Sequence, residues 1–424
     1  MKSIHERLSI AVLLALSVAM ASPPTARSAE QVQVPDPSMM LPLVPHAADK
    51  GAPPVISPGT RLTYYGMSAS VRGEYEKLVQ DENGNWIDKN TGRRYRQEEI
   101  GSASGAGLSV VHVGRIAGPV AQLSTKLYVL DAATGNYMFS LGGGIVTHAG
   151  CAADYWIHPD LLGKVEPINR QGVRIVRMPY TVNNKTYKAI RFQTEDASGY
   201  NARVYDLETG LLIYHGSRTQ GPPVMTPPLG NSGMPGLGRG STQLTTGWIV
   251  EVKDIDVPWK NAAAPDWTGR VQQLAYSGAQ STMMPAVGSK LDRPMTANFE
   301  IRARGSGWLR FKNHIAIQSY PGMPTEQSTQ DGASGNATIG GLWIPPGAMQ
   351  ELSQGTVLEQ NPHVGITTTV SQVMPGYITV SEVGPLHRID YTYDRTTGMM
   401  GAMNVAQQVG MATITHSVQL TDRR

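Results

Sequence analysis

Cysteine is nearly absent from this chain: Cys151 is the only one among 424 residues. A single cysteine excludes an internal disulfide and any metal site built from several cysteines. Charged residues make up only 16% of the sequence, and the formal net charge is +3. Such a small charge gives no reason to expect binding to nucleic acid or to a membrane surface. We therefore expect a fold stabilised by its hydrophobic core, without covalent cross-links.

Long hydrophobic runs are also missing after the start of the chain. Leu8–Met20 is a mostly apolar stretch of 13 residues that follows Lys2 and Arg7 and ends in a small-residue cleavage pattern, Ala19-Met20-Ala21. A run of this length predicts an export signal over residues 1–21, with an uncleaved anchor as the alternative. No later stretch has 18 uninterrupted apolar residues, so we expect no membrane span after signal cleavage. The predicted location is the periplasm or the cell exterior.

Glycine and proline are abundant, with 46 and 29 residues, whereas phenylalanine occurs only four times. Short runs rich in Val, Ile, Thr and Tyr alternate with turn residues, which predicts a mainly β fold. A mature chain of about 400 residues is longer than a single hydrophobic core usually supports, so we expect two domains. The predicted division is a disordered lead-in over 22–58, a β domain over 59–220, a Pro/Gly linker over 221–242 and a second β domain over 243–424.

Three short motifs occur in both halves of the sequence in the same order. They are Leu-x-Tyr-x-Gly at 62–66 and 274–278, Trp-Ile at 156–157 and 343–344, and Tyr-Asp-x-x-Thr-Gly at 205–210 and 393–398. The last two motifs are separated by nearly the same distance in each half, which predicts an internal duplication into two related antiparallel β domains. Pro159 and Pro346 follow the two Trp-Ile pairs and predict a short helix in each domain.

The pattern Asp-x-x-Thr-Gly occurs four times, always between β-prone runs. Aspartate can accept backbone N–H bonds across a turn, and glycine accepts a positive φ without steric cost. We therefore interpret the motif as a structural turn and not as a catalytic carboxylate, because no partner acid or base recurs beside it. The turn residues are Asp88 with Gly92, Asp131 with Gly135, Asp206 with Gly210, and Asp394 with Gly398.

One copy of this turn, in LYVLDAATGN, resembles the strand-turn segment of quinoprotein propeller blades. The four copies begin at 88, 131, 206 and 394, and these intervals do not repeat a blade period. We therefore expect neither a propeller nor a quinone cofactor.

The segment Leu141–Asp160 carries the residues most suggestive of a site. Its glycines at 142–144 predict a flexible loop, and loops on a rigid β scaffold are where binding usually resides. Cysteine with histidine can also form a thiolate nucleophile. No His pair with helical spacing is present, so we expect no metal site. The candidate binding residues are His148, Cys151, Asp154, Tyr155, Trp156 and His158.

Together these observations predict an exported, non-enzymatic binding protein, either a carrier or an envelope component. Curved antiparallel sheets with a short helix resemble periplasmic lipid and lipoprotein carriers, which implies a small apolar ligand, with an envelope protein as the other expected partner. No cofactor is expected. The alternative function is an exported hydrolase or thiol enzyme using Cys151 and His148. A carrier requires an apolar concavity, whereas a thiol enzyme requires a cysteine of lowered pKa.

Overall fold

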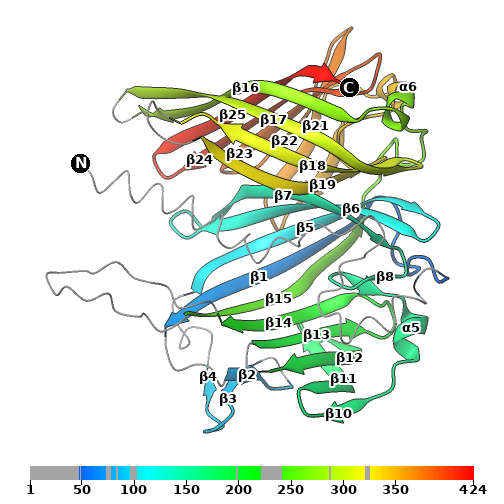
Figure 1. The fold of residues 1–424 in the computed structure, drawn as a ribbon, viewed down its shortest axis with the longest axis vertical. Helices are drawn as coiled ribbons and strands as arrows, with labels where there is room; N and C mark the ends of the chain where they lie inside the picture. The colour runs from blue at the N-terminus through cyan, green and yellow to red at the C-terminus, as the bar shows by residue number, and fades with distance from the viewer. Residues whose placement is uncertain are drawn as a thin grey trace, which may run out of the picture.

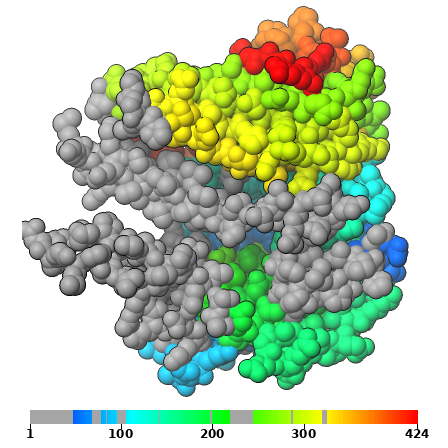
Figure 2. Space-filling view, viewed as in Figure 1, coloured from blue at the N-terminus to red at the C-terminus, as the bar shows by residue number. Residues whose placement is uncertain are grey.

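The structure, a computed structural model, describes residues 47, 49–72, 78–82, 85–95, 103–196, 199–220, 241–285, 288–319 and 325–424. The described residues are mostly β-strands in two large antiparallel sheets and one small sheet. Figures 1 and 2 show the two large sheets as the lower and upper parts of one elongated molecule. The expectation of a mainly antiparallel β fold is confirmed.

The first sheet has 12 strands. In spatial order they are β10 (Ile168–Arg170), β11 (Val173–Val182), β12 (Lys185–Glu195), β13 (Gly199–Asp206), β14 (Leu212–Gln220), β15 (Ser241–Asp254), β1 (Thr60–Arg72), β5 (Ala103–Ala117), β6 (Val120–Asp131), β7 (Asn136–His148), β8 (Cys151–Ala152) and β9 (Trp156–Ile157). A separate sheet of three short strands contains β2 (Leu78–Gln80), β3 (Trp86–Asp88) and β4 (Arg94–Tyr95).

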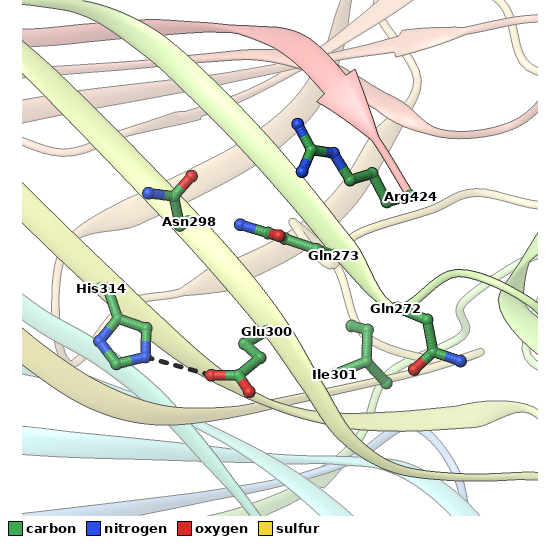
Figure 3. A pocket seen from close by; sticks show the side chains of 7 residues that line it. All are labelled: Gln272, Gln273, Asn298, Glu300, Ile301, His314 and Arg424. Carbon is green, nitrogen blue, oxygen red and sulfur yellow. Dashed lines mark ion pairs between the residues drawn. The ribbon is translucent and has the colours of Figure 1, made fainter.

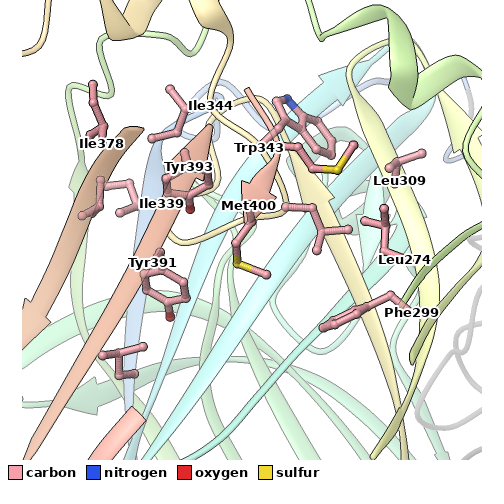
Figure 4. Close-up of a cluster of buried hydrophobic side chains, with 14 of the residues drawn as sticks. Leu274, Phe299, Leu309, Ile339, Trp343, Ile344, Ile378, Tyr391, Tyr393 and Met400 are labelled. Carbon is pink, nitrogen blue, oxygen red and sulfur yellow. The ribbon is translucent and has the colours of Figure 1, made fainter. Parts of the chain in front are cut away.

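The second large sheet has 10 strands, all from the C-terminal part of the chain. In spatial order they are β19 (Glu326–Gly335), β18 (Trp308–Ile317), β17 (Ser289–Gly305), β16 (Gln273–Met284), β25 (Ala412–Arg423), β24 (Met400–Val409), β23 (His387–Asp394), β22 (Tyr377–Val383), β21 (Ile366–Val373) and β20 (Val357–Asn361). The inner face of this sheet buries the largest hydrophobic cluster, which includes Trp343, Tyr393 and Phe299 (Figure 4).

Each half contains a short helix directly after its Trp-Ile pair, as the sequence predicts. These are α5 (Pro159–Gly163) and α6 (Pro346–Met349), each with a proline in its first turn. The one-turn 3₁₀ helix η1 (Asp266–Gly269) precedes the second sheet.

The two halves make the same local hydrogen bonds around this helix. In the first half, the Ile157 N–H donates to the Gly210 carbonyl at 2.9 Å, and the Tyr205 hydroxyl donates to the Ala153 carbonyl. The corresponding bonds in the second half run from Ile344 N to Gly398 O at 3.0 Å and from Tyr393 Oη to Gly341 O at 2.9 Å. This correspondence supports a common origin of the halves, and the internal duplication stays a prediction.

The change from one sheet to the other does not coincide with the predicted linker at 221–242. β14 and β15 are paired neighbours in the first sheet, from Tyr214 with Trp248 to Gln220 with Thr242. Residues 221–240 lie outside the described residues and connect these two strands. The chain passes to the second sheet only after Asp254, the last residue of β15. Proline and glycine density in the sequence could not show which strands this segment joins.

The end of the expected disordered lead-in also differs from its prediction. Ala47 and Ile56 are buried in the hydrophobic clusters of the first half. The Lys50 ammonium lies 2.8 Å from the Asp160 carboxylate beside α5. These contacts order residues that show no periodic pattern, because a segment without secondary structure can still bury single apolar side chains.

Strands β5 and β6 are shared by the cores of both halves. Val111 and Leu123 lie in a hydrophobic cluster of the first half, whereas Val110 and Tyr128 pack with Ile366 of the second sheet. Because side chains alternate between the two faces of a strand, one strand can serve two cores. Figure 1 accordingly shows β5, β6 and β7 between the rest of the first sheet and the second sheet.

The glycines at 142–144 lie inside strand β7, not in the flexible loop that the sequence predicts. A Cβ atom on Gly144 would lie only 2.5 Å from the backbone nitrogen of Ala333 in β19. Glycine within a strand often marks a close backbone approach, and here it allows β7 and β19 of different sheets to come together. The glycines of β7 therefore mark a close approach between two strands and not a flexible loop.

Candidate functional site

The cysteine–histidine pair predicted from the sequence is close in space but is not activated. His148 and Cys151 face each other across the tight turn between β7 and β8. Cys151 is fully buried, and burial together with the nearby Asp154 charge raises the pKa of its thiol to about 12. A catalytic thiol requires the opposite shift. Burial also lowers the pKa of His148, which disfavours an imidazolium that would stabilise a thiolate.

The other predicted binding residues point to different surroundings. Trp156 is fully buried, and its indole N–H donates to the Ala149 carbonyl at 2.7 Å. Asp154 pairs with Arg203 at 3.3 Å, and the Tyr155 ring lies 6.1 Å from the Tyr64 ring. The remaining residue, His158, caps α5 by accepting the Asp160 N–H at 3.2 Å. These side chains therefore have different immediate partners, and their role in binding stays a prediction.

The repeated aspartates all use their carboxylates within their own turns. The Asp88 carboxylate accepts the N–H groups of Asn90 and Thr91 at 2.7 and 3.0 Å. The corresponding acceptors in the other turns are Asp131, Asp206 and Asp394. Gly92, Gly135, Gly210 and Gly398 have φ values of +67°, +70°, +76° and +74°. These are the turn geometries that the spacing of Asp and Gly favours.

Two clusters of buried charges join the two sheets, and the sequence analysis identified neither of them. In the first cluster, the Glu359 carboxylate lies 2.8 Å from Arg61 Nη1 and 3.0 Å from His112 Nε2. Arg61 also pairs with Glu251 of β15. Burial alone would raise the pKa of Glu359, but His112 and Arg61 together hold it well below its usual range.

The second cluster is centred on Glu382 of β22. Its carboxylate pairs with Lys126 and accepts the Tyr128 hydroxyl at 2.8 Å, while His387 Nε2 lies at 3.2 Å. Burial alone would raise the pKa of Glu382, but the Lys126 charge and these hydrogen bonds lower it to about 2. The signal was present in the sequence, because Glu382 follows Ile378 and Val380 with the two-residue period of the buried face.

A small hollow lies on the second sheet near the C-terminal end of β25. It has a volume of about 510 Å³ and is lined by Gln272, Gln273, Asn298, Glu300, Ile301, His314 and Arg424. Figure 3 shows the Gln273 and Asn298 amides between Arg424 and the pair formed by Glu300 and His314, in which His314 Nε2 lies 3.5 Å from the Glu300 carboxylate. Polar groups from three adjacent strands therefore converge here.

A larger hollow adjoins the first, and Arg424 lines both. Its volume is about 1000 Å³, and it lies between residues 258–271, the α6 region and the turn at 396–397. Its apolar lining includes Pro258, Pro265, Pro345, Pro346 and Trp267. Its charged lining residues are Asp266, Arg270, Glu351, Arg423 and Arg424, all exposed. The two together are called the joined hollows below.

At the corresponding end of the first half, an ion pair connects the helix to the segment that precedes the sheet. There, Lys50 precedes the first sheet and pairs with Asp160 in the first turn of α5. The position that corresponds to Asp160 in α6 is Gly347, counted from the proline that starts each helix. Gly347 cannot form an equivalent ion pair, and in the second half a hollow lies between the helix and the segment before the sheet.

Within the described residues, no cluster of three or more His, Cys, Asp or Glu side chains is arranged to hold a metal ion. None of the helices described here is long and apolar enough to cross a membrane.

No family model matches this chain, and no curated protein is similar to it in sequence. The chain aligns weakly with the solved structure of a double mutant of Transferrin Binding Protein B from Haemophilus parasuis Hp5, with a TM-score of 0.15 and 7% identity over 88% of this chain and 78% of that one. It aligns similarly with intact Ap-TbpB, with a TM-score of 0.11 and 6% identity over 88% and 79% of the two chains. TM-scores this low carry no argument about function.

Proposed function

We propose that this chain is an exported, non-enzymatic binding protein and that its ligand occupies the joined hollows. The observation that carries the proposal is the set of charged side chains around the larger hollow. Arg270 and Arg423 are exposed and make no ion pair within the described residues, and the same is true of Asp266 and Glu351. Unpaired charges around a partly apolar recess are typical of a surface that orients a ligand.

The open end of the second half is a better candidate than the segment 141–160 of the first. Cys151 and Trp156 are buried, and Lys50 pairs with Asp160 beside α5. The charged lining of the joined hollows also favours a polar ligand over the small apolar ligand expected from the sequence. An envelope protein or another component of the envelope remains compatible with this chemistry.

Export is supported by the sequence pattern of residues 1–21, which lie outside the described residues. On this proposal the mature protein starts near Ser22, in the periplasm or outside the cell.

Crystals of the mature protein soaked with a mixed set of monosaccharides, dipeptides and small carboxylates test the binding surface without assuming the ligand. We expect fragments in the joined hollows, beside Trp267 and Gln273. Fragments that occupy only other surfaces would contradict the proposal.

A further inference from the structure

The joined hollows form an elongated site. Arg424 lines both, and Val271 of the larger hollow is followed directly in sequence by Gln272 of the smaller one. A ligand that contacts both Trp267 and Asn298 must therefore extend along the end of the sheet, across β16 and β17. This shape matches an elongated molecule better than a compact ion.

The smaller hollow has the chemistry to bind hydroxyl groups. Gln272, Gln273 and Asn298 each offer an amide N–H₂ donor and a carbonyl acceptor. A hydroxyl group is both donor and acceptor, so adjacent hydroxyls match such amides better than a carboxylate or an apolar group does. Glu300 adds acceptors at the same surface and pairs with Arg302 at 2.6 Å. Both ring nitrogens of His314 have partners within the protein, so this ring helps to position Glu300.

The larger hollow has a flat apolar element held in a defined orientation. The Trp267 indole N–H donates to the Thr397 carbonyl at 2.9 Å, and its ring packs edge-on against Trp343 at 6.1 Å. Its side chain is only partly buried and lines the hollow together with Pro265 and Pro346. A partly exposed tryptophan with a fixed orientation offers a flat surface for the C–H face of a sugar ring.

Two arginines of the larger hollow offer positive charge to an anionic ligand. Arg270 and Arg423 lack ion-pair partners within the described residues, and a guanidinium matches a carboxylate with two parallel hydrogen bonds. Asp266 and Glu351 line the same hollow, so its net charge is small. That balance suits a chain with one carboxylate per sugar ring and disfavours a more densely charged polyanion such as a polyphosphate.

We propose that the joined hollows bind an acidic oligosaccharide, with a ring face on Trp267, hydroxyls on the amides of the smaller hollow and carboxylates on Arg270 and Arg423. This inference rests on the proposed function and names its ligand class. An acidic peptide would satisfy the arginines, but its backbone would not present the adjacent hydroxyls that the Gln273 and Asn298 amides match (Figure 3).

Isothermal titration calorimetry of the whole mature protein tests the ligand class with three probes: hexagalacturonate, the neutral maltohexaose and a hexaglutamate peptide. We expect hexagalacturonate to bind most tightly and its affinity to fall as salt is added. The double variant Arg270→Gln/Arg423→Gln should weaken hexagalacturonate binding about tenfold or more, because charge-assisted hydrogen bonds are lost. Arg170→Gln, an exposed arginine on β10 in the first sheet, serves as the matched control and should leave binding unchanged.

Asn298→Ala tests the smaller hollow separately and should weaken both saccharides without changing the melting temperature. Tight hexaglutamate binding that depends on the same two arginines, without saccharide binding, would overturn the ligand class and leave the proposed function standing. If Arg270→Gln/Arg423→Gln and Asn298→Ala all leave hexagalacturonate binding unchanged, the ligand does not bind in the joined hollows. If no probe binds but soaked fragments occupy the joined hollows, only the proposal of an acidic oligosaccharide fails. If the fragments also avoid the joined hollows, the proposed binding function fails with it.

Discussion

The ionisable side chains buried where the sheets meet are paired across the interface. Glu359 and Glu382 belong to the second sheet, and their partners Arg61, His112 and Lys126 belong to the first. Burying a charge is costly unless it is paired and hydrogen-bonded, so the loss of one partner leaves the other in an unfavourable state. These pairs therefore make the docking of the sheets specific to one arrangement.

The substitution Glu382→Gln should destabilise the protein by about 3–5 kcal/mol, because it leaves the Lys126 ammonium buried without a counter-charge. The measurement is the free energy of unfolding from a urea titration. Glu351→Gln provides the control, since Glu351 is exposed and has no ion pair in the described structure, and it should change stability by less than about 0.5 kcal/mol. Equal effects of the two substitutions would contradict the role of the cluster.

Glu382 should also contribute to the pH dependence of the free energy of unfolding. The pKa of Glu382 is about 2 in the folded protein against an ordinary value of 4.5. A lowered folded pKa means that the stabilisation is complete above about pH 4.5 and is lost as the pH falls towards 2. Glu382→Gln should flatten the stability profile in this range, and an unchanged profile would show that other groups control acid unfolding.

The thiol of Cys151 should be inert in the folded protein. Burial keeps the cysteine protonated and out of reach of reagents. Ellman's reagent should give no rapid reaction under native conditions and one thiol per chain in denaturant. Rapid labelling of the folded protein would restore the thiol-enzyme alternative.

At the scale of elements, the repeated turn has the same geometry but not the same surroundings. Gly135 joins β6 and β7 with no atom within 4 Å of an added Cβ. At Gly210, the added Cβ would lie 2.1 Å from the Ile157 carbonyl oxygen. The first turn is a free hairpin, whereas the second is packed against the strand that leads into α5.

These surroundings predict different costs for one substitution. Gly135→Ala should cost about 1–2 kcal/mol, the usual cost of placing alanine at positive φ. Gly210→Ala should cost at least about twice as much, because backbone must move away from the new Cβ. Thermal unfolding of both variants provides the comparison, and equal melting temperatures would mean that the packing around Gly210 is not rigid.

At the scale of the molecule, the two sheets are not independent units. β5 and β6 contribute to the core of the first half with one face and pack against the second sheet with the other. The second sheet also takes its counter-charges for Glu359 and Glu382 from the first. Folding of the second half should therefore depend on the first.

Residues 255–424 produced alone should not reach the stability of the whole chain, because two buried carboxylates would lose their partners. Co-production with residues 22–254 should restore a folded complex. Circular dichroism and size-exclusion chromatography distinguish these states. A fragment 255–424 that unfolds at the temperature of the intact protein would instead establish an autonomous domain.

Features that depend on neighbouring residues could be predicted from the sequence. The Asp-x-x-Thr-Gly spacing predicted tight turns because the aspartate and glycine act within five residues of each other. Pro159 and Pro346 predicted two short helices because proline suits a first helical turn. Alternating Thr, Val, Ile and Tyr predicted antiparallel strands for the same local reason.

Features that depend on contacts between distant segments could not be predicted from the sequence. Gly144 predicts a loop or a close approach equally well until β19 is placed beside β7. Pairing of Glu382 with Lys126 joins residues 256 positions apart, and no local pattern encodes it. Likewise, the larger hollow combines residues 258–271, 345–351, 396–397 and 423–424. Local chemistry determines which element each segment forms, whereas the site arises from the order in which the folded strands bring distant side chains together.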